Sequence, residues 1–238
     1  MIILISENIT SDPYLRSKTH LFKDRCEAGK MLTKILTIPN NPIVLAIPSG
    51  GVPVGYCLSR VLKASLDVII VRKVPIPGNP EAGFGAIAPD GSLILNKSLV
   101  EQLGLKQDEI MNIAKLRLNE IRSRIVKFRG NREVEDISKK DAIIVDDGIA
   151  SGYTILAAIK SVRKNNPKKI IVAVPTGHDQ AINLVSKEAD EVYCLNIRSG
   201  LSFAVADAYT DWYDVDDDEV KDYLKKAWFN TNSNSSSS

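Results

Sequence analysis

Residues Asp141 to Thr154 read DAIIVDDGIASGYT, and this stretch decides the fold of the chain. Ala142 to Val145 form a short, continuous apolar run rich in β-branched residues, which is typical of a strand buried on both faces. Two adjacent acids follow this run. A loop of small residues then leads into residues 155–162, whose apolar periodicity predicts a helix. Strands that alternate with helices in this way predict a parallel α/β sheet.

The loop after this strand has the composition of an anion site. Its backbone N–H groups can converge on one point, and the dipole of the following helix favours an anion there. Asp146 and Asp147 suit hydroxyl groups or a cation instead, and since they lie beyond the strand we expect both outside the core. Ribose 5-phosphate, with a phosphate beside a diol, fits both parts. The alternative is a solvated acidic turn before a helix.

The segment IIVDDGIASGYT resembles the 5-phosphoribosyl 1-pyrophosphate (PRPP) motif of the type I phosphoribosyltransferases. The resemblance implies that Asp146 and Asp147 hold the ribose hydroxyls and take part in catalysis. It implies that Mg²⁺ is held mainly by oxygens of PRPP, with no direct protein ligand beyond these two acids. The residues implied in binding the 5′-phosphate are Gly148, Ile149, Ala150, Ser151, Gly152, Tyr153 and Thr154.

Length and composition set the limits of these expectations. The chain has 238 residues and 44% apolar content, which favours one large α/β domain. Its formal net charge of +2 does not indicate a polyanion-binding protein. No apolar run reaches membrane-spanning length, and MIILISENIT lacks the basic start of a signal peptide, so we expect a cytoplasmic protein. We expect a phosphoribosyltransferase domain over 1–229, hood elements included, and a disordered Asn/Ser tail over 230–238.

The cysteines predict no special chemistry. Cys26, Cys57 and Cys194 show no CxxC spacing and have no histidine pair nearby. We therefore interpret them as small buried side chains in a reducing compartment, in preference to metal ligands or a disulfide.

A second strand–loop–helix junction precedes the first in sequence. Ile43 to Ile47 predict a buried strand, and residues 54–62 predict a helix. The glycines between them do not follow GxGxxG, which argues against a nicotinamide site. By resemblance, Ser49, Gly50 and Gly51 would bind pyrophosphate. Relatives often have a basic residue where Ser49 stands, and a simple tight turn is the alternative.

Two cations and a segment rich in proline and glycine follow this junction in the sequence. Residues 66–71 predict a strand whose carboxyl end carries Arg72 and Lys73, our candidates for neutralising pyrophosphate, with a solvated strand end as the alternative. Val74 to Gly91 holds four prolines and four glycines and cannot be a regular helix. A hairpin is predicted across Asp90–Gly91. The family has a mobile loop here, and residues 78–85 would close over the reacting centre with Glu81 as the catalytic carboxylate.

The predicted helices differ in charge. Residues 19–36 predict an amphipathic helix with Arg25 on its solvent side, and residues 97–103 a short one. Residues 108–129 predict a long helix. The stretch from Lys115 to Arg132 is strongly basic, which indicates a solvated face or, as the alternative, a nucleic-acid patch.

The last third of the chain completes the expected sheet. Residues 169–175 and 191–195 predict strands, and 181–187 a helix between them. The aromatic-rich stretch 196–214 would form the hood that selects the base, with Phe203 and Tyr209 as its candidates. The acids of Asp214 to Glu219 read as the start of a final helix.

The resemblance extends from Phe22 to Val220 and is strongest to a group of phosphoribosyltransferases of unassigned function, through AIPSGGVPVG, DVIIVRKVPIPGNPEAGFGA and VDDGIASGYT. It implies a doubly wound, mainly parallel sheet flanked by helices with a small hood. It implies a pentosyltransferase that moves the phosphoribosyl group of PRPP-Mg²⁺ to or from a nitrogenous base, as a homodimer. Alternatives are a non-catalytic PRPP-sensing or RNA-binding regulator and a flavodoxin-like nucleotide module. The acceptor base is not predicted.

Overall fold

A computed structural model describes residues 7–200 and 202–234 and contains a parallel six-stranded sheet in the order β1-β9-β8-β7-β2-β3. Helical crossovers join β2 to β3, β7 to β8 and β8 to β9, which is the expected α/β architecture. The strands of this sheet are β1 (Ile9–Thr10), β2 (Pro42–Ala46), β3 (Ser65–Val68), β7 (Asp141–Val145), β8 (Lys169–His178) and β9 (Glu191–Arg198).

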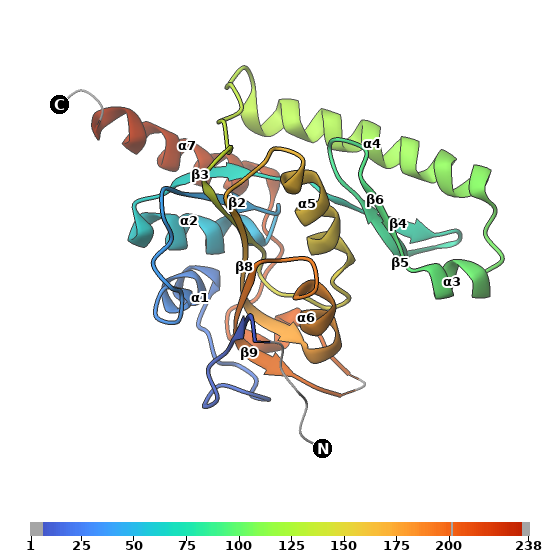
Figure 1. The fold of residues 1–238 in the computed structure, drawn as a ribbon, viewed down its shortest axis with the longest axis horizontal. Helices are drawn as coiled ribbons and strands as arrows, with labels where there is room; N and C mark the ends of the chain where they lie inside the picture. The colour runs from blue at the N-terminus through green and yellow to red at the C-terminus, as the bar shows by residue number, and fades with distance from the viewer. Residues whose placement is uncertain (1–6, 201, 235–238) are drawn as a thin grey trace.

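Helices cover both faces of the sheet (Figure 1). Alternate residues of the central strands enter different cores: Val44 packs with one set of helices, and Ile43 and Leu45 with the other. Because both faces of these strands are buried, their sequences are continuous apolar runs. One face is covered by α1 (Arg25–Leu32), α2 (Gly51–Leu62) and α7 (Asp217–Asn234), and the other by α5 (Tyr153–Arg163) and α6 (Asp179–Val185).

A second, antiparallel sheet of three strands stands beside the main one (Figure 1). Its turn between β5 and β6 is the predicted Asp90–Gly91 hairpin, where Gly91 has φ +83°. The predicted helices over 97–103 and 108–129 are confirmed. The elements of this part are β4 (Arg72–Ile76), β5 (Asn79–Ile87), β6 (Leu93–Leu95), α3 (Lys97–Gln102) and α4 (Gln107–Arg129).

Three segments near the predicted site differ from the prediction in structure or in extent. The strand expected over 66–71 ends at Val68, and Arg72 and Lys73 open β4 of the second sheet. Residues 79–85, expected in a loop without regular structure, belong to β5, because their backbone pairs with β4 around a register shift. The first helix begins only at Arg25, because Asp24 accepts the N–H of Glu27 and caps it.

Part of the segment expected as the hood pairs with the residues that precede the first helix. Leu21 and Phe22 donate to the carbonyl of Ala208, and Thr210 donates to that of Phe22. A short 3₁₀ helix, η1 (Val205–Ala208), lies between β9 and this pairing. Of the predicted tail, residues 230–234 continue α7, and residues 235–238 lie outside the described residues.

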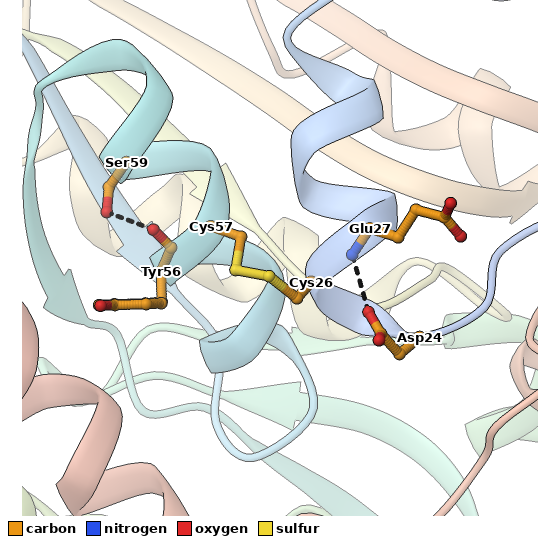
Figure 2. Close-up of a disulfide and its surroundings, with 6 residues drawn as sticks. All are labelled: Asp24, Cys26, Glu27, Tyr56, Cys57 and Ser59. Carbon is orange, nitrogen blue, oxygen red and sulfur yellow. Dashed lines mark hydrogen bonds between the residues drawn. A yellow bond between two sulfur atoms is a disulfide. The ribbon is translucent and has the colours of Figure 1, made fainter.

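The expectation of three unpaired cysteines is wrong. Cys26 on α1 and Cys57 on α2 form a disulfide with a Cα–Cα distance of 5.3 Å (Figure 2). The two helices can approach so closely because a Cβ on Gly29 would lie 2.3 Å from the carbonyl oxygen of Val54. Sequence spacing carries no signal for this pairing, which depends on how the helices pack. Cys194 is a buried free thiol, as expected.

Within 7–200 and 202–234, no helix is both long enough and apolar enough to cross a membrane.

Candidate functional site

The two predicted junctions meet at the carboxyl edge of the sheet. β2 and β7 are parallel neighbours, so the loops that follow them lie side by side. A Cβ on Gly50 would lie 1.8 Å from Asp147 Oδ2, and one on Gly51 would lie 2.9 Å from the Cα of Asp146. Only glycine permits this approach. The peptide bond between Pro48 and Ser49, at the start of the first loop, is cis.

Asp147 is held by a buried arginine. Arg25 Nε donates to Asp147 Oδ2 at 2.9 Å, and the two side chains are 5% and 16% exposed. The hydroxyl of Tyr209 donates to the main-chain carbonyl of Asp147 at 2.6 Å. Asp147 is thus tied to the first helix and to the hood. Its side chain is half-buried and belongs to neither hydrophobic core.

Arg25 is the residue that sequence reasoning missed, since we expected it on the solvent side. Its Nη1 donates to the carbonyl of Tyr213 at 2.8 Å, and its guanidinium lies 4.0 Å from the centroid of the Trp212 ring. Its partners lie 122 to 188 positions away in the chain, so no local pattern could reveal them.

The two acids have displaced pKa values. Burial raises the pKa of Asp146 well above its usual range, and the negative charge of Asp147 adds to this effect. Burial also raises the pKa of Asp147, while the guanidinium of Arg25 opposes that rise. Asp146 accepts the main-chain N–H of Asp147 but has no cation beside it as close as Arg25 is to Asp147.

The loop of the PRPP-like motif is attached to β8 at one point. The N–H of Ile149 donates to the carbonyl of Thr176, and its carbonyl accepts from the N–H of His178. Ile149 is also buried, so it offers no donor to a ligand. Gly152, with φ +86°, caps α5. In the part of the chain that the structure describes, the N–H groups of 150–152 donate to no protein acceptor, which leaves 150–154 as the cradle.

This geometry agrees with the comparisons. Residues 27–208 match the model of the phosphoribosyl transferase domain. Two curated proteins from strains of Mycobacterium tuberculosis, each named "Putative phosphoribosyl transferase", are 38% identical over 209 residues. These residues are 87% of this chain and 47% of each relative, so the chain spans about half their length. The crystal structure of TT1426 from Thermus thermophilus has a TM-score of 0.72 at 33% identity, over 86% of this chain and 98% of that one.

The chain belongs to the phosphoribosyl transferase family.

In this phosphoribosyl transferase domain, the residues predicted to bind pyrophosphate have different surroundings. Ser49 Oγ accepts from Arg124 Nη2 of α4 at 3.1 Å. Arg72 turns towards α4, with its Nε 3.7 Å from Glu120 Oε2, and burial lowers its pKa, with the charge of Arg124 adding to the effect. Lys73 is exposed, and its stem lies where a Cβ on Gly83 would be.

The two hood candidates have different surroundings. Tyr209 is 2% exposed and its ring contacts those of Phe22 and Trp212, so the protein itself covers this ring. Burial raises its pKa well above the usual range. Phe203 is half-buried and meets the ring of His178 edge-on at 5.7 Å. A cavity of about 390 Å³ borders His178, with Asp179, Gln180 and Gly200 in its lining.

Two further expectations concern catalysis and metal. The backbone of Glu81 lies in β5, and its side chain lies outside the described residues. No cluster of three or more His, Cys, Asp or Glu residues suited to a metal occurs among the residues described. The carboxylate of Asp146 is an oxygen ligand of the kind Mg²⁺ prefers, and its site is compatible with one or two protein oxygens beside a phosphorylated ligand.

Proposed function

We propose that the protein binds PRPP with Mg²⁺ and transfers the 5-phosphoribosyl group to or from a nitrogenous base, with pyrophosphate as the other product. The observation that carries this proposal is the contact between the two loops at Gly50 and Asp147. A ligand bound there has a phosphate cradle on one side and a second glycine loop on the other. PRPP has anionic groups at both ends of a diol-bearing ring, which matches this arrangement.

The roles follow from which groups remain available. The N–H groups of 150–154 at the start of α5 would bind the 5′-phosphate. Asp146 would accept hydrogen bonds from the ribose hydroxyls, because Asp147 Oδ2 already accepts from Arg25. Asp147 would then hold the backbone of the motif in place. Mg²⁺, when bound with PRPP, would neutralise part of the pyrophosphate charge.

The reaction requires stabilisation of opposite charges. As the bond from ribose to pyrophosphate breaks, positive charge develops on the sugar and negative charge on the leaving group. Asp146, ionised once Mg²⁺ is bound with PRPP, would stabilise the positive charge on the sugar. The backbone N–H groups at 49–51 and the nearby arginines would stabilise the negative charge on the leaving group. The hairpin of β4 and β5 would exclude water from the sugar cation.

The test is a turnover screen of nucleobases and related nitrogen heterocycles with PRPP and Mg²⁺, read as pyrophosphate release. We expect one class of base to support turnover and Asp146→Asn to abolish most of it. If PRPP binds and no acceptor in the screen gives product, the non-catalytic PRPP sensor becomes the better description.

The RNA-binding alternative has less support. Arg129 of α4 forms an ion pair with the buried Asp67. Arg132 stacks on Trp228. Cations that are already paired contribute less to binding a polyanion. A salt-dependent RNA-binding assay separates the two functions.

A homodimer and a cytoplasmic location remain proposals. The Cys26–Cys57 disulfide is a feature uncommon among cytosolic proteins. Sedimentation of the purified protein and thiol titration of a freshly prepared extract test these two proposals.

A further inference from the structure

A group of arginines gathers beside the first glycine loop, on elements that the PRPP-like motif does not include. Arg117 and Arg124 come from α4, and Arg72 comes from the start of β4. The charges of Arg117 and Arg124 both lower the pKa of Arg72, so the three guanidinium groups lie within electrostatic range of one another. We call these three residues the arginine cluster.

The cluster has more positive charge than its neighbours neutralise. Glu120 pairs with Arg117 at 2.6 Å and lies 3.7 Å from Arg72. Asp217 of α7 pairs with Arg124 and also with Lys127, each at 2.6 Å. Four cations thus share two carboxylates. Like charges held this close disfavour the folded state unless a further anion joins them.

The cluster also has unused hydrogen-bond donors. In the described part of the chain, the buried Nε atoms of Arg72, Arg117 and Arg124 have no hydrogen-bond partner. Arg124 makes both of its polar contacts, to Ser49 Oγ and Asp217 Oδ1, through Nη2. Its guanidinium therefore lies at the edge of the glycine loop, packed on the ring of Phe128 at 4.8 Å, and its buried Nε is an unsatisfied donor.

We propose that Arg124, supported by Arg72, is the cation that binds the pyrophosphate group of PRPP, in place of a basic residue within the loop itself. This rests on the proposed function, since it assigns a residue to one end of the same ligand. Ser49 is uncharged, and Arg124 reaches it from α4, so a long helix supplies the charge that the loop lacks. Without ligand, Asp217 is the counter-ion of Arg124. The carboxylate of Asp217 therefore competes with the pyrophosphate group for Arg124.

The experiment compares three ligands by calorimetry: PRPP, inorganic pyrophosphate and ribose 5-phosphate, each with Mg²⁺. Arg124→Gln should weaken PRPP and pyrophosphate binding about ten- to hundredfold, as expected for loss of a charged hydrogen bond, and should leave ribose 5-phosphate binding unchanged. Arg124→Lys should recover part of the loss. Arg122→Gln is the matched control, because Arg122 is exposed on the same helix, and it should change none of the three.

Asp217→Asn distinguishes ligand binding from a structural role. This substitution breaks the Arg124–Asp217 ion pair but leaves Arg124 in place. The Asp217→Asn variant should therefore bind PRPP at least as tightly as the wild type does. If Asp217→Asn and Arg124→Gln weaken PRPP equally, Arg124 acts only through its ion pair and the inference is wrong. It is also wrong if Arg124→Gln leaves PRPP affinity unchanged while the wild type binds PRPP. If the wild type binds neither PRPP nor ribose 5-phosphate, the proposed function itself fails.

Discussion

Two adjacent acids of one motif have different surroundings. Asp147 forms a buried ion pair with Arg25, whereas Asp146 accepts a main-chain N–H and lies beside the negative charge of Asp147. The motif by itself presents them as equivalent. The ion pair with Arg25 of α1 ties Asp147 to the fold, and in the proposed function it is Asp146 that contacts the ligand.

Asp147→Asn is therefore expected to destabilise the fold as well as to disturb the site. It removes the charge that compensates the buried Arg25, and the loss of one partner of such a pair costs about 3 kcal/mol. Denaturant unfolding followed by circular dichroism measures this change. Asp146→Asn is the control and should not lower stability at pH 7. Equal stability of wild type and Asp147→Asn would contradict the anchoring role.

Asp146 also predicts how stability depends on pH. Its pKa is raised in the folded protein above the ordinary value of 3.8, so the folded state keeps a proton that the unfolded state loses. Its contribution to stability is complete below pH 3.8 and is lost as the pH rises through the folded pKa. Without ligand, the unfolding free energy of the wild type should fall relative to that of Asp146→Asn as the pH rises from 3.8 to the folded pKa of Asp146. Parallel pH profiles for the two proteins would refute the prediction.

At the scale of the elements, the positions of α1 and α2 are fixed relative to each other. α1 supplies Arg25 to the acids, α2 follows the glycine loop, and the Cys26–Cys57 disulfide joins them (Figure 2). Their close packing at Gly29 and Val54 sets the position of Arg25 relative to the loop. The site therefore depends on contacts between helices as much as on the motif residues.

Replacing Cys57 with Ser should lower the unfolding free energy by about 3–4 kcal/mol, because the disulfide spans 31 positions and restricts the unfolded chain. Denaturant titration with and without a reductant measures the loss. The reductant should destabilise the wild type to a similar extent and leave the Cys26→Ser, Cys57→Ser double variant unchanged. A wild type that does not respond to reductant under unfolding conditions would show that the bond contributes nothing.

The β4–β5 hairpin is the element that we expect to close over the site. Deleting Asn79 to Ala82, next to the register shift at its tip, should change PRPP affinity by less than about threefold and lower turnover by about 100-fold or more, because shielding acts on the transition state. Single-turnover kinetics and calorimetry measure the two quantities separately. A large and equal fall in both would place the hairpin in the ground-state binding site, and no change in either would make it a plain surface connection.

At the scale of the whole molecule, ligand binding should raise the free energy of unfolding. PRPP with Mg²⁺ at about 100 times its dissociation constant stabilises the native state by about 2.7 kcal/mol, which raises the melting temperature of a domain of this size by about 5–10 °C. Differential scanning calorimetry measures the shift, with Mg²⁺ alone as the control. No shift at millimolar PRPP, with a folded sample, would count against PRPP as the ligand.

The sequence by itself determined the two strand–loop–helix junctions, β2 to α2 and β7 to α5. These features are local: periodicity, glycine positions and adjacent acids act over a few residues, so the chain shows them without its fold. It also predicted the Asp90–Gly91 hairpin and the long α4, for the same reason.

Only the tertiary structure decided what each residue of the site touches. The Arg25–Asp147 pair spans 122 positions, the Arg124–Ser49 contact spans 75, and the disulfide spans 31. Such contacts depend on which helices pack on which face of the sheet and how closely. That arrangement results from the packing of the entire core, which no short window of sequence contains.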